Sequence, residues 1–145
     1  MLPILMVCLA LLVQPACVLY TRGVMYAAAA EACRLMATAP SSSAVADEAR
    51  RAYVLRRLSA VPNVDVFHVG GDAGWHVELE GGPGSHVVSA RISTWVRPLP
   101  FVGAPAFLLG ERDGQGNVLV KVAVTQTVRP EWLEDTYASW SRIWP

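Results

Sequence analysis

The chain has 145 residues and a formal net charge of zero. This length accommodates one modest domain, and a neutral chain lacks the excess of Lys and Arg that binding to nucleic-acid phosphates requires. All three cysteines lie before residue 40, which excludes a disulfide framework in the rest of the chain.

Residues 1–21 form an apolar run without a charged side chain, and this run predicts a transmembrane helix. Tyr20 and Arg22 then supply an interfacial aromatic ring and a cation. A cleaved signal peptide would need a basic n-region and an Ala-x-Ala-like site, and neither is present. A lipoprotein signal cut before Cys17 is a further alternative, but Gln14 stands where such signals have Leu.

The next segment, 22–39, extends the predicted helix beyond the membrane. It is rich in Ala, Leu, Met, Glu and Arg and contains no proline before its end near residues 38–40. Small residues permit close approach of helices, so we expect contacts between helices at Ala27, Ala28, Ala30 and Glu31. The alternative is that these alanines serve helix propensity alone.

The remaining residues, 40–145, predict a small α+β domain. Ser43 is the expected N-cap of a helix over 43–60, because acidic residues follow it and two arginines lie near the far end. Pro62 ends this helix. Its expected apolar stripe is weak and consists of Val45, Ala49, Ala52, Leu55 and Leu58.

Four strands are predicted, over 64–69, 75–80, 85–96 and 117–129. A hairpin that pairs Val69 with Trp75 would give the sheet one apolar and one polar face. A sheet with one apolar face needs a cover. The predicted helices 43–60 and 131–143 are the available lids.

Two apolar segments leave alternatives open. The proline-rich part of 97–116 either caps the open end of the core or contacts the membrane or a partner. In the C-terminal helix, aromatic residues recur at three- and four-residue spacing, which suits packing on the sheet or a protein interface. The candidate interface residues are Trp132, Tyr137, Trp140 and Trp144.

The sequence offers little catalytic chemistry. His68 and His76 would face each other across the predicted hairpin, but catalytic zinc needs three protein ligands, and His86 falls on the other face. The chain has no nucleophile elbow, no phosphate-binding loop and no dinucleotide fingerprint. We therefore expect no enzyme, no cofactor and no metal site.

Four short stretches resemble a known family. They are 2–6 (LPILM), the pair Tyr20 and Arg22, 28–34 (AAAEACR) and 96–100 (VRPLP). These stretches are similar to the TadE-like family, the membrane-anchored minor pilins or pseudopilins of tight-adherence (Flp, type IVb) pilus machinery. In that family a basic leader and a Glu precede the apolar run. This sequence begins within the run, so no residue here is assigned as a processing site.

The resemblance implies a single-pass membrane protein of a bacterial cell with an extracytoplasmic C-terminal domain. Its expected partners are membrane lipid and other pilin or pilus-assembly proteins, with no nucleic acid and no small-molecule substrate. Taken alone, the arginines that follow the span would favour a cytoplasmic domain. The alternative function is a membrane-tethered binding module of the cell envelope that never enters a filament.

Overall fold

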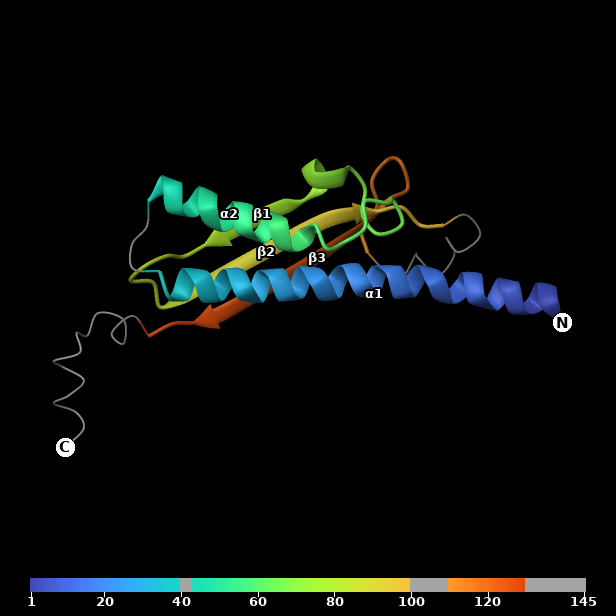
Figure 1. Cartoon of the computed structure of the whole chain (residues 1–145), viewed down its shortest axis with the longest axis horizontal. Helices are drawn as coiled ribbons and strands as arrows, with labels where there is room; N and C mark the ends of the chain where they lie inside the picture. Colours follow the sequence, from blue (N-terminus) through green and yellow to red (C-terminus); the bar gives the residue numbers. More distant parts are fainter. Residues whose placement is uncertain (40–42, 100–109, 130–145) are drawn as a thin grey trace, which may run out of the picture.

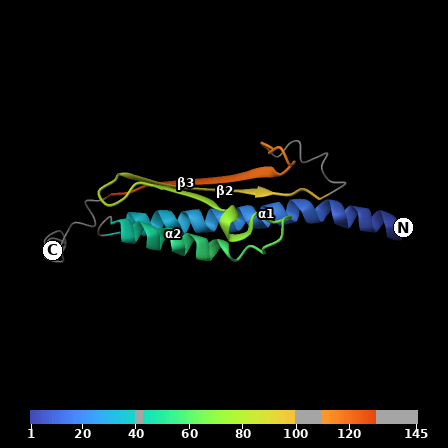
Figure 2. The same cartoon turned by 90° about the horizontal axis from the view of Figure 1, so that it is seen from above.

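The computed structural model describes residues 1–39, 43–99 and 110–129. Their elements are α1 (Leu2–Ala37), α2 (Ala44–Leu58), the 3-10 helix η1 (Gly71–Gly74), β1 (His76–Glu80), β2 (Val87–Val96) and β3 (Val118–Thr127). Both α-helices lie side by side on one face of the sheet (Figure 1 and Figure 2). The fold is the predicted one: α+β and pilin-like, with a long apolar N-terminal helix packed on a small antiparallel sheet.

Helix α1 runs without interruption from the apolar N-terminal residues into the alanine-rich stretch. Pro3 lies in its first turn, where a backbone N–H would have no partner in any case. At the other end, Thr38 donates its N–H (3.0 Å) and its hydroxyl (2.9 Å) to the carbonyl oxygen of Arg34. These contacts confirm the predicted end of the helix.

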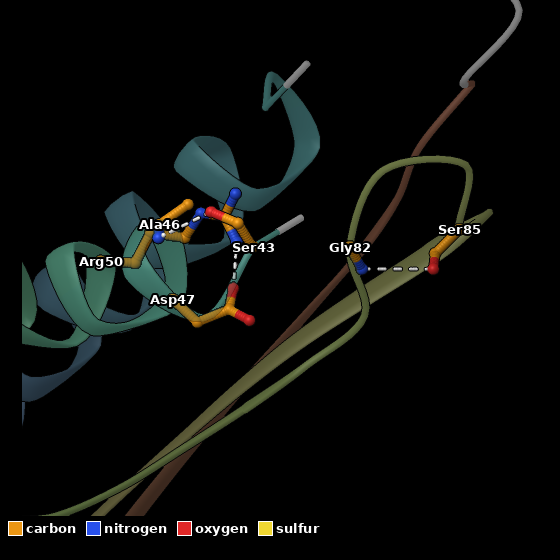
Figure 3. A network of polar contacts seen from close by, with 6 residues as sticks. All are labelled: Ser43, Ala46, Asp47, Arg50, Gly82 and Ser85. Carbon is orange, nitrogen blue, oxygen red and sulfur yellow. Dashed lines mark hydrogen bonds and ion pairs between the residues drawn. The ribbon is translucent and has the colours of Figure 1, made fainter. Parts of the chain in front are cut away.

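Helix α2 begins as predicted. The Oγ of Ser43 accepts the N–H of Ala46 at 3.1 Å, and Asp47 pairs with Arg50 in the next turn (Figure 3). The predicted apolar stripe is only partly correct. Val45 is 80% exposed, and Ala49 and Ala52 are also exposed, whereas Leu58 is buried. The stripe begins too early because the first turns of α2 contribute no buried apolar side chain; the buried residues of the helix are Val54 and Leu58.

In the sheet, β2 lies between β1 and β3 and is antiparallel to both. The chain turns from β1 to β2 at Gly81, whose φ of 97° favours glycine. The turn is closed by Gly82, which donates its N–H to the Oγ of Ser85 at 3.2 Å (Figure 3). The turn between the predicted strands 75–80 and 85–96 is thus confirmed, whereas the hairpin predicted before β1 is absent.

Alternation along the strands gives the sheet one buried and one exposed face, as predicted. The exposed face carries polar side chains such as His76, Glu78 and Lys121. The buried face meets the helices with Val77, Val88, Ala90, Ile92, Val96, Val118, Val120, Val122 and Val124.

The predicted strand over 64–69 is wrong. These residues form turns, in which Phe67 donates its N–H to the carbonyl of Val64 at 2.8 Å. After Pro62 the chain folds back so that the ring of Phe67 meets the ring of Tyr20 edge-on, with centroids 5.9 Å apart. A contact with α1 thus overrides the local strand preference. The described residues form three strands, not four.

The core lies between α1, α2 and the buried face of the sheet. Helix α1 packs on β2 and β3 and also on α2, so it supplies much of the lid that the sequence assigned to 43–60. Its buried residues include Met25, Ala29, Cys33 and Met36. The second predicted lid, 131–143, lies outside the described residues.

Candidate functional site

The first third of α1 projects beyond the sheet (Figure 1). We call residues 1–13 the bare segment, because its large apolar side chains are about half exposed or more. They are Met1, Leu2, Ile4, Leu5, Met6, Val7, Leu9, Leu11, Leu12 and Val13. A contiguous exposed apolar surface marks a contact with membrane or protein. Helix α1 is long and apolar enough to cross a membrane, a property that a signal sequence near an N-terminus shares.

Contacts between α1 and the rest of the domain begin immediately after the bare segment. Gln14 is only 4% exposed, and its Oε1 accepts the N–H of Leu99 at 2.7 Å. One and a half turns later, the hydroxyl of Tyr20 donates to the carbonyl of Ala60 at 3.2 Å. The hydroxyl of Thr21 donates to the carbonyl of Phe67 at 3.0 Å. These three hydrogen bonds fix the helix against loops that lie far away in sequence.

The bare segment is short compared with the thickness of a bilayer. Residues 2–13 of the helix rise only about 18 Å at 1.5 Å per residue, whereas the hydrocarbon core is about 30 Å thick. The bare segment is therefore shorter than a membrane span, and residues 14–21, which the sequence assigns to the predicted span, contact the domain. No free stretch of helix separates the bare segment from the part of α1 that contacts the domain.

The four residues of α1 that were predicted to make contacts between helices lie partly inside the core and partly on the surface. Ala28 is buried, and Ala30 is partly buried against the core, so both pack within the chain. Ala27 is exposed on the outward side of the helix. Glu31 makes a contact between helices, but with α2 of the same chain. A contact of this strip with a neighbouring chain stays a prediction.

Glu31 joins α1 to α2 through its carboxylate. It accepts hydrogen bonds from the hydroxyl of Tyr53 at 2.9 Å and from the Nε of Arg57 at 2.7 Å. The hydrogen bond from the Arg57 guanidinium holds the pKa of the Glu31 carboxyl below its usual range. Both side chains of the ion pair are partly exposed, so solvent screens it and its contribution to stability is small.

The outward side of α1 and the edge of β3 border an open surface hollow of about 440 Å³. Leu19, Gly23 and Tyr26 line it from the helix, and Lys121 and Ala123 line it from the strand. No atom lies within 4 Å of the position that a Cβ on Gly23 would occupy. Glycine inside a helix costs about 1 kcal/mol relative to alanine, and packing within the described chain gives no reason for it here.

The two histidines do not face each other. His68 is 2% exposed, and its ring stacks on that of Trp75 with centroids 4.4 Å apart. His76 lies on the exposed face of β1. The predicted Val69–Trp75 hairpin is absent because η1 occupies this part of the chain, so the facing arrangement is wrong. Among the described residues, no group of three or more His, Cys, Asp or Glu could hold a metal ion.

Burial lowers the pKa of His68, against the smaller opposing influence of the carboxylates of Asp72 and Asp65. Its Nδ1 is buried without a hydrogen-bond partner in the part of the chain that the structure describes. A neutral imidazole tolerates this environment better than a charged one. His68 is therefore a buried histidine of the core rather than a surface ligand.

The four aromatic residues proposed as an interface, Trp132, Tyr137, Trp140 and Trp144, lie outside the described residues, as does much of the apolar part of 97–116. Sequence reasoning missed the docking contacts of Gln14 and Thr21. A lone Gln inside an apolar run was the available signal, because a buried amide needs a hydrogen-bond partner.

Searches among protein-family models, curated proteins and solved structures find no match to this chain.

Proposed function

We propose that the chain is a membrane-anchored structural or assembly component of a type IVb (tight-adherence) pilus or a related secretion apparatus, and specifically a TadE-like minor pilin. The observation that carries this proposal is the distribution of exposed and buried apolar residues along α1. One helix supplies an uncharged, exposed apolar end and, further along, a main wall of the domain core. The resemblance of residues 2–6 and 28–34 to the family adds the assignment to pili.

In this proposal the bare segment has two successive environments. Before assembly it lies in lipid, where apolar side chains and a hydrogen-bonded helical backbone are stable. After assembly it packs against the helices of neighbouring subunits. Both environments accept the same uncharged surface, so transfer from one to the other does not require a buried charge to be moved.

The first test is the location of the full chain in its native cells. A C-terminal reporter enzyme that is active only outside the cytoplasm should be active, and immunoblots should detect the chain in pili sheared from the cell surface. A cytoplasmic C-terminus contradicts the proposal. An external C-terminus without the chain in sheared pili favours the tethered binding module instead.

A charge in the bare segment tests the role of this surface. Leu9→Arg places a cation where a membrane helix disfavours it by about 2.5–3.5 kcal/mol, so the variant should leave the membrane fraction and the pili. Ala49→Arg is the matched control, because Ala49 is exposed on α2, within the domain. Equal membrane recovery of the two variants would contradict anchoring by the bare segment.

A further inference from the structure

Strand β3 forms one edge of the sheet, and its backbone alternates between β2 and the open side. Leu119 donates its N–H to the carbonyl of Glu111 at 2.8 Å, on the side away from β2. In an antiparallel strand the N–H and C=O of one residue point to the same side, and successive residues alternate. The backbone groups of Lys121, Ala123 and Thr125 therefore also point away from β2.

These three residues are exposed, and no hydrogen bond from their outward N–H groups is found in the described ranges 1–39, 43–99 and 110–129. The hairpin at 111–118 covers only the beginning of the edge. An open edge of this kind is a template for another strand, because its N–H and C=O groups need partners. Lys121 is the only charged side chain of β3.

The opposite edge of the sheet is β1. Val69, which precedes β1, donates its N–H to the carbonyl of Trp95. The backbone N–H and C=O groups of the odd-numbered residues of β2 therefore point toward β1. The register pairs Glu78 with Arg91, so the even-numbered residues of β1 form the backbone hydrogen bonds with β2. The backbone groups of Val77 and Leu79 consequently point outward. Within the described part of the chain, the sheet thus has two edges with backbone groups that lack a partner, on β1 and on β3.

The direction of α1 decides how two copies can join. A two-fold pairing of β3 with β3 would be antiparallel, and it would send the two bare segments in opposite directions. Two chains anchored in one membrane cannot adopt that arrangement. Strands β1 and β3 are both antiparallel to β2 and therefore parallel to each other. A second copy placed alongside in the same orientation brings its β1 parallel to β3 of the first.

The charges of the two edges are complementary. On the exposed face of the sheet, β1 carries the carboxylates of Glu78 and Glu80, and β3 carries the ammonium group of Lys121. All three side chains are more than half exposed. Within its own chain, Arg91 pairs with both carboxylates and Lys121 pairs with Glu111, so a contact between copies exchanges these exposed ion pairs for new ones. In a joined sheet these groups lie on the same face of neighbouring strands, where opposite charges favour pairing.

We propose that β3 of one copy pairs in parallel with β1 of the next, so that the sheets join side by side with every α1 pointing the same way. The contact is heterologous and does not close on itself, which suits a linear assembly. The inference deepens the proposed function and rests on it for the common direction of the anchors. The next copy brings its α2 beside the hollow that contains Gly23 and Tyr26.

Cysteine cross-linking of the full chain in its native membrane tests this contact. Two differently tagged copies, both with the native thiols removed by Cys8→Ala, Cys17→Ala and Cys33→Ala, are co-expressed and treated with a short bismaleimide. One copy carries Ala123→Cys and the other carries Glu78→Cys. Neighbouring strands lie about 4.8 Å apart, so the mixed pair should give a dimer carrying both tags. The matched controls are two Ala123→Cys copies and a pair of Ala123→Cys with Gln115→Cys, which is exposed in the turn before β3 on the far edge of the next copy. The dimer should be absent from both.

A second variant tests the role of the backbone. Ala123→Pro removes an outward N–H without removing a bond to β2, a position at which edge strands accept proline. With Thr125→Cys as the reporter against Glu78→Cys, it should abolish the mixed dimer while the variant still melts cooperatively in detergent. A dimer that survives Ala123→Pro overturns the proposed pairing.

The remaining outcomes separate this contact from the proposed function. A cross-link between two Ala123→Cys copies, a cross-link only to a protein of different mass, or no cross-link overturns the pairing of β3 with β1. If the chain is nevertheless present in sheared pili, the proposed function stands without this contact. If the mixed dimer forms but the chain never enters pili, the contact stands and the pilus function fails.

Discussion

Replacing Ala29 by leucine tests whether α1 packs closely on the sheet. The side chain of Ala29 is 0% exposed within the core formed with β2 and β3. Three additional carbon atoms have no free volume there, so the helix or the strands must shift. Overpacking of this kind costs about 2 kcal/mol, which lowers the melting temperature by about 8 °C for a folded unit of this size.

The matched control is the same substitution two residues earlier. Ala27 is exposed, and leucine and alanine have similar helix propensities, so Ala27→Leu should change stability by less than about 0.5 kcal/mol. Thermal unfolding in detergent, followed by circular dichroism and tryptophan fluorescence, measures both variants. Equal melting temperatures for the two variants would refute the close packing of Ala29. A loss of Ala27→Leu from pili without a loss of stability would support a contact between subunits at that position.

Three further predictions concern the domain. Ser43→Ala should cost about 1 kcal/mol, measured by urea unfolding, because α2 loses its N-cap. Glu31→Gln should lower the free energy of unfolding by at most about 1 kcal/mol. The hydrogen bond from Arg57 lowers the pKa of Glu31, so this loss should be complete above about pH 4.3, the ordinary pKa of Glu, and should disappear as the pH falls through the lowered pKa. The native chain should lose stability as the pH falls through about 6.5, the ordinary pKa of histidine, since burial lowers the pKa of His68 and the unfolded state binds the proton more readily.

Each of these predictions has its own control. Ser43→Asp retains a capping oxygen and should keep the stability of the native chain. For the ion pair, equal losses at pH 3 and pH 7 for Glu31→Gln would show that charge is not involved. His68→Phe retains a ring to stack on Trp75 and removes the titrating group. If its stability still declines between pH 7 and pH 5 as steeply as that of the native chain, His68 is not the group responsible.

The elements that could be predicted from the sequence are those with a local signal. The helix α1 follows from unbroken apolar and alanine-rich composition, and Ser43 followed by acidic residues marks the start of α2. Alternation of β-branched residues in β2 and β3 gives the buried face correctly, because one face of the sheet is covered and the other is not.

The errors arise where contacts distant in sequence decide the outcome. The alternating residues of 64–69 suit a strand, but the attraction of Phe67 to Tyr20 on α1 directs them into turns. His68 is then buried rather than exposed. The strip around Ala28 has a composition that suits contact with any helix or sheet, and composition alone cannot tell whether that partner is the same chain or a neighbour.

A helix of 36 residues that joins an exposed apolar end to a wall of the core has a mechanical consequence. A pull or a twist applied to its N-terminal end reaches the sheet directly, since no loop separates the two. Pro15 is the point of least stiffness, because it removes one backbone hydrogen bond between the bare segment and the docked part. Force on the bare segment would therefore tilt and rotate the whole domain, and any bending would concentrate at Pro15.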